Sequence, residues 1–114
     1  MENNIFYVYI LVKDATQAKL PPAVRQTLSS DCGENMILLL SVCKERELEE
    51  CLTEKVKFWK ESMVNVKTNF NGVELIIHQI RTSDGGLKLS HTIIRSIAEA
   101  KLTLKVTYTD CKLI

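Results

Sequence analysis

The chain has 114 residues, of which 46% are hydrophobic and 25% charged, and its formal net charge is +1. This length suits one domain with one core, so residues 1–114 are predicted to form a single α/β domain. The composition excludes intrinsic disorder and fibrous classes, and no run of about five basic residues supports direct nucleic-acid binding.

Residues 5–12 form a continuous apolar run, which predicts a central strand buried on both faces. The acidic Glu2 precedes this run and no small-residue cleavage site follows it, so we expect a strand and not a secretion signal. No apolar run reaches the roughly 18 residues that span a bilayer. The expected protein is therefore cytoplasmic and has no membrane segment.

Two weaker elements follow. Pro21 and Pro22 predict a short helix over residues 22–29, because proline is tolerated in the first helical turn. A turn is expected around residues 31–33, and the apolar run at 36–43 then predicts a second strand.

Residues 45–63 form the longest periodic segment and contain the single tryptophan of the chain. The apolar side chains recur at spacings of 4, 4, 3 and 4, which places them on one stripe of an α-helix. The predicted stripe consists of Leu48, Leu52, Val56, Trp59 and Met63.

Asn71 and Gly72 carry the clearest turn signal, because an Asn-Gly pair readily adopts a type I′ hairpin turn. The favoured prediction is a hairpin of strands over residues 64–70 and 73–77. The alternative continues the long helix through Val66 and leaves a strand over residues 73–80.

After a break at residues 83–86, Ser90 is the expected N-cap of a helix over residues 91–101. Its predicted apolar positions are Ile93, Ile94, Ile97 and Ala98. Residues 102–108 then alternate, which predicts a strand with one buried face formed by Leu102, Leu104, Val106 and Tyr108. The predicted fold is α+β, a two-layer sandwich in the order β-α-β-α-β-β-α-β, with about three helices on a mainly antiparallel sheet of four or five strands.

No catalytic, cofactor-binding or metal-binding motif is evident. The four cysteines have no C-x-x-C spacing, so reduced thiols and no zinc site are expected of Cys32, Cys43, Cys51 and Cys111. His78 and His91 match no local ligand or phosphoesterase spacing, and Gly85-Gly86 lacks the partners of a phosphate-binding loop.

The long helix carries five glutamates within ten residues, at Glu45, Glu47, Glu49, Glu50 and Glu54. Negative charge near a helix N-terminus is stabilised by the helix dipole, so helix stability alone is one interpretation. The other is a partner-binding surface, because a dense patch of one sign can steer a basic protein.

Residues 85–90, GGLKLS, precede the helix whose residues 94–99 read IRSIAE, and the alternating strand follows. These residues, about a quarter of the chain, resemble the C-terminal end of small α/β bacterial immunity proteins. In those proteins a similar turn, short helix and strand close the sheet. The resemblance implies a cytoplasmic antitoxin of a contact-dependent growth inhibition system, which binds its toxin and has no catalytic activity. Many such toxins are nucleases with basic grooves, including tRNA-cleaving enzymes, and the acidic helix would complement one.

Two other functions remain open. One is a small enzyme or ligand-binding domain whose site is assembled from scattered residues such as Glu74, His78 and Cys111. The other is a structural or adaptor subunit that forms a homodimer through an edge strand.

Overall fold

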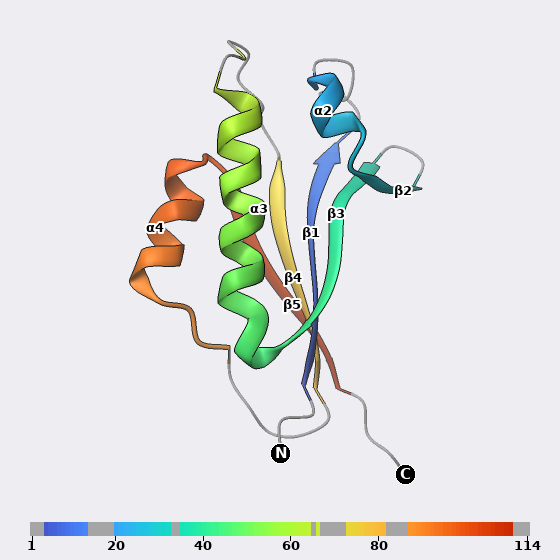
Figure 1. Cartoon of the computed structure of the whole chain (residues 1–114). Helices are drawn as coiled ribbons and strands as arrows, with labels where there is room; N and C mark the ends of the chain where they lie inside the picture. The colour runs from blue at the N-terminus through green and yellow to red at the C-terminus, as the bar shows by residue number, and fades with distance from the viewer. Residues whose placement is uncertain are drawn as a thin grey trace.

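A computed structural model describes residues 4–13, 20–32, 35–64, 66, 73–81 and 87–110. They form a five-stranded sheet in the order β2-β3-β1-β4-β5, with the helices on one side (Figure 1). All neighbouring strands are antiparallel except β4 and β5. The predicted two-layer α+β class, with a mainly antiparallel sheet, is confirmed.

The elements follow one another along the chain with these bounds: β1 (Ile5–Lys13), α2 (Pro22–Arg25), β2 (Leu28–Cys32), β3 (Asn35–Lys44), the 3-10 helix η1 (Glu45–Glu47), α3 (Leu48–Met63), β4 (Glu74–Arg81), α4 (His91–Glu99) and β5 (Thr103–Asp110). Among the described residues, no helix is long and apolar enough to cross a membrane.

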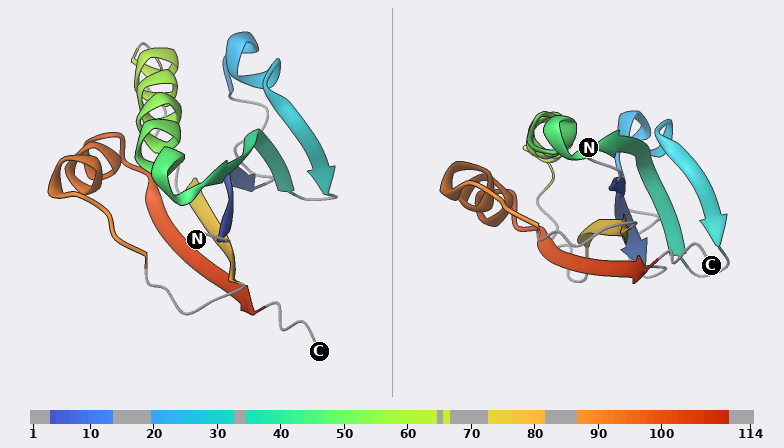
Figure 2. Two further views of the ribbon diagram at one scale, coloured as in Figure 1. Left: turned by 60° about the horizontal axis from the view of Figure 1, so that its bottom comes forward. Right: turned by 90° about the horizontal axis from the view of Figure 1, so that it is seen from below.

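Strand β1 occupies the centre of the sheet, as predicted. Burial alternates along it, so the prediction of burial on both faces is wrong. Phe6, Val8 and Ile10 are fully buried in the core, whereas Ile5 at the start of the strand is 41% exposed. The helices cover only one face, and the outward side chains of β1 therefore remain partly accessible (Figure 2).

Helix α3 covers the middle of the sheet with the predicted stripe. Leu48, Leu52, Val56 and Trp59 are buried in the core, and Met63 packs against it. Lys55 is also buried on this side of the helix. Its Nζ donates a hydrogen bond to Ser41 Oγ on β3 at 2.6 Å.

Helix α3 ends at Met63, three residues before the alternative end at Val66. The favoured hairpin turn falls on residues 71–72, which lie outside the described residues. The sheet neighbours of strand β4 are β1 and β5. The fifth strand of the sheet is the edge strand β2, which the sequence did not reveal.

The predicted helix at residues 22–29 is too long. Thr27 donates to the Val24 carbonyl from both its amide and its hydroxyl, and helix α2 has already ended at Arg25. The Thr27 carbonyl accepts from Leu39 N on β3, and the chain then continues as the edge strand β2. Pairing with a neighbouring strand thus overrides a weak local helix signal.

Helix α4 starts at the predicted N-cap, where Ser90 Oγ accepts from Ile93 N at 3.3 Å. Ile93 and Ile97 are buried, but Ile94 is 47% exposed, and Ala98 is exposed as well. The predicted apolar face was therefore too wide, because a helix of nine residues lying beside α3 buries only a narrow stripe.

Strand β5 runs parallel to β4, and its predicted buried face is only half correct. Leu102 is buried and Leu104 packs against the core, whereas Val106 and Tyr108 are 45% and 60% exposed. Figure 2 shows β5 leading away from α3 and α4 toward the C-terminus. Its second half therefore lies beyond the helices that would cover it.

Candidate partner-binding surfaces

The five predicted partner-binding glutamates all lie on η1 and the first half of α3. One of them caps the helical segment, because Glu47 Oε1 accepts a hydrogen bond from Lys44 N at 3.2 Å. This contact satisfies a backbone donor that has no helical partner at the start of the segment. Glu47 therefore has a structural role.

Glu49 has a second structural role. Its Oε1 accepts from Ser90 N at 2.8 Å, which ties α3 to the first turn of α4. Hydrogen bonding from the Ser90 side chain and backbone holds the pKa of Glu49 below its usual value. Because Ser90 also caps α4, these two residues position the second helix on the first.

Glu50 and Glu54 lie one turn apart on the side of α3 that is opposite its buried stripe. At about 100° per residue, they point away from the side that carries the buried Leu48, Leu52 and Trp59. Both are exposed, and neither forms a salt bridge with any described residue. These two carboxylates are therefore available to a partner.

Two further residues complete this side of α3. The exposed Lys57 and Glu61 follow at helical spacing, and the sequence interpretation missed Glu61 because it lies outside the glutamate cluster. We call Glu50, Glu54 and Glu61 the acidic stripe. Glu45, on η1, is partly buried and is not a member of the stripe.

No protein-family model, curated protein or solved structure matches the chain. The function must therefore be inferred from the surfaces and side chains of this chain.

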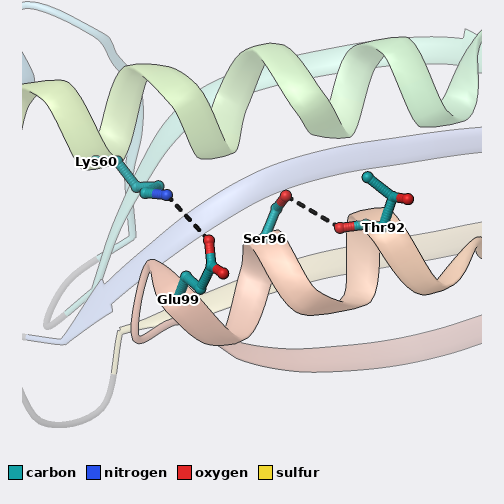
Figure 3. Close-up of polar contacts among 4 residues, drawn as sticks. All are labelled: Lys60, Thr92, Ser96 and Glu99. Atoms are coloured by element: carbon teal, nitrogen blue, oxygen red, sulfur yellow. Dashed lines mark hydrogen bonds and ion pairs between the residues drawn. The ribbon is translucent and has the colours of Figure 1, made fainter.

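A groove between α3 and α4 runs beside the acidic stripe. Figure 3 shows the polar contacts among the side chains around it. Lys60 Nζ lies 3.3 Å from Glu99 Oε2, and Ser96 Oγ donates to the Thr92 carbonyl. The groove has a volume of about 270 Å³ and is lined by Thr53, Val56, Lys57, Lys60, Glu61 and Ser96. That volume is at the lower limit for a small-molecule pocket, and its best-placed cation is already paired with Glu99.

Of the alternative site of Glu74, His78 and Cys111, the structure describes Glu74 and His78. His78 Nδ1 lies 2.6 Å from Thr107 Oγ1, and its Nε2 lies 3.0 Å from Thr109 Oγ1, so both ring nitrogens are occupied within the sheet. Glu74 lies 3.9 Å from Lys13 Nζ, and Cys111 falls outside the described residues. His91 is exposed at the start of α4.

The buried Cys43 thiol is a poor nucleophile. Burial raises the pKa of Cys43 to about 12, with further contributions from Cys51, which hydrogen-bonds to it, and from Glu47. A thiol with such a pKa is almost entirely protonated near neutral pH and reacts slowly. Among the described residues, no group of three or more His, Cys, Asp or Glu side chains is placed to hold a metal ion.

The second candidate surface is the side of the sheet that faces away from the helices (Figure 2). Alternation along the strands places seven apolar side chains near its centre: Ile5, Tyr7 and Tyr9 of β1, Leu40 and Val42 of β3, and Ile76 and Ile80 of β4. We call this set the open sheet face. The sequence contains a signal for this face, because residues 5–12 are apolar on both sides of the strand. The sequence interpretation explained that pattern by burial of both faces.

Proposed function

We propose that this chain is a cytoplasmic bacterial immunity protein that binds and neutralises a cognate toxin, with no catalytic activity of its own. The observation that carries the proposal is the acidic stripe, whose Glu50 and Glu54 are exposed and unpaired within the described residues. The resemblance of residues 85–108 to the C-terminal end of immunity proteins supports the same function.

The chemistry of the stripe indicates a basic partner. Carboxylates without an internal partner raise the local negative potential, which attracts a cationic surface over roughly one Debye length of about 8 Å at physiological salt. A nuclease toxin carries such a surface where it binds the phosphates of its substrate. An immunity protein that covers this groove would block access of the nucleic acid.

The test uses the product of the gene immediately upstream of this chain, which the proposal predicts to be a large secreted toxin. Association is measured by stopped flow at several salt concentrations for wild type and for Glu50→Lys/Glu54→Lys. Because exposed charges at an interface act mainly by steering, the variant should associate more slowly, on the order of tenfold, with a weaker salt dependence. Glu47 and Glu49 are left unchanged, since both serve the fold.

A matched control variant distinguishes the effect of charge at the acidic stripe from the effect of the net charge of the chain. Glu99→Lys/Asp110→Lys changes the net charge by the same amount but lies on α4 and β5, where each carboxylate makes only a surface salt bridge. It should associate at a rate much closer to wild type. Equal association rates for wild type and Glu50→Lys/Glu54→Lys would remove the acidic stripe from the interface, and failure of the wild type to bind would reject the immunity function.

A further inference from the structure

The open sheet face is more exposed than a core surface and more apolar than an ordinary solvated one. Ile5, Leu40 and Val42 are 41%, 44% and 59% exposed. Tyr7 and Tyr9 on β1 and Ile80 on β4 lie beside them and are partly buried. On β4 the face also contains Ile76, which is only 4% exposed, and the partly buried His78. The apolar side chains thus continue across three adjacent strands, β3, β1 and β4.

Charged and polar groups surround this apolar centre. Lys44 stands at the end of β3, and Lys105 stands on the edge strand β5. At the other end of the central strands, Lys13 of β1 pairs with Glu74 of β4. An apolar centre with a polar margin is the usual arrangement of a protein interface. The lysine side chains at the margin are long enough to reach solvent when the centre is covered.

The size of the face fits a dimer. A strand spacing of about 4.8 Å and a rise of about 3.3 Å per residue give a five-stranded face of roughly 600 Å² in projection. Because the side chains project from the sheet, the accessible area of the face is larger than this projection. It approaches the roughly 800 Å² that each partner buries in a standard interface. The apolar centre covers three of the five strands, about 400 Å² in projection, and patches of this size on a protein surface are often functional.

The nature of the patch favours a partner that is always present. Under the proposed function, on which this step rests, the chain must remain folded and dispersed before it meets a toxin, and a permanently open apolar sheet would promote aggregation. A second copy of the chain is available whenever the chain itself is present, and homodimer interfaces are more apolar than transient ones. A basic toxin fits this face less well, because Lys44 and Lys105 stand at its margin.

We propose that the open sheet face is the interface between two copies of this chain, which pack sheet against sheet in a symmetric dimer. The two-layer protomers then form a four-layer assembly with helices outside and both sheets inside. The acidic stripe points away from the sheet and stays accessible on each protomer. The dimer is therefore independent of the toxin site.

Sedimentation equilibrium over a concentration series tests this interface. Wild type should have about twice the 13.0 kDa mass of one chain. Val42→Glu and Ile5→Glu should each lower the mass to that of one chain, with an unchanged circular dichroism spectrum, because both side chains already contact solvent. Ile94→Glu is the control: Ile94 is similarly exposed, at 47%, but lies on α4, and this variant should remain a dimer.

Ile5 lies on the central strand, so its substitution also distinguishes sheet packing from pairing of edge strands. A monomeric wild type at every concentration would overturn the proposal, as would a dimer that persists in Ile5→Glu. Association with the toxin domain should be unchanged in Val42→Glu. Loss of toxin binding there, with a monomeric wild type, would assign the face to the toxin instead.

Discussion

Trp59→Ala is the sharpest test of the core. Trp59 is only 4% exposed and belongs to the apolar stripe of α3 that packs on the sheet. Removing a buried tryptophan costs about 3–5 kcal/mol through lost burial and the cavity that remains. A domain of this size has a free energy of unfolding of about 5–15 kcal/mol, so the substitution removes a large share of it.

Urea denaturation followed by circular dichroism measures this loss. Thermal unfolding should show a fall in Tm of roughly 10–20 °C, given the usual entropy of unfolding for a small domain. Val64→Ala, at the C-cap of the same helix and 74% exposed, is the control and should change stability by less than about 0.5 kcal/mol. A loss of under about 1 kcal/mol in Trp59→Ala, or tryptophan emission at the solvent-exposed wavelength in wild type, would refute the packing of α3 on the sheet.

Two further predictions concern polar side chains. The pKa of Glu49 is lowered from its ordinary value of 4.5 by its hydrogen bonds to Ser90, so its stabilising contribution is present above pH 4.5 and is lost as the pH falls through the lowered pKa. Glu49→Gln should weaken the acid dependence of unfolding, and an unchanged pH profile would contradict the tie between α3 and α4. Gln79 is 4% exposed, and its Nε2 has no hydrogen-bond partner among the described residues. Gln79→Met should therefore raise the free energy of unfolding, by about 1 kcal/mol, because an unpaired buried donor is costly. A loss of stability in urea denaturation would instead mean that the amide is satisfied, for example by an ordered water.

Local patterns predicted the helices best. The spacing of Leu48, Leu52, Val56 and Trp59 specifies a stripe from the sequence alone, and Ser90 marks the start of α4 through its hydroxyl. Both signals depend on residues within a few positions of each other. The end of α2 and the burial of β5 depend on contacts between distant residues, which local patterns do not reveal. Helix α2 ends where the chain pairs with β3, and the second half of β5 lies beyond the helices.

The candidate sites were harder to predict for the same reason. Glu47 and Glu49 look equivalent to Glu50 and Glu54 in the sequence, yet Glu49 is bonded to Ser90, which is 41 positions away. The apolar run of β1 has the same pattern whether its second face meets a helix layer or another protein. The two cases are distinguished by the placement of the described helices, which all lie on the other face (Figure 2).

Calorimetric titration of the wild-type chain with the adjacent toxin domain tests the proposed function most directly, together with an assay of the toxin's nuclease activity. The proposal predicts saturable binding at one toxin per chain and loss of toxin activity at that ratio. No binding heat at several temperatures and full toxin activity in the presence of excess chain would contradict it.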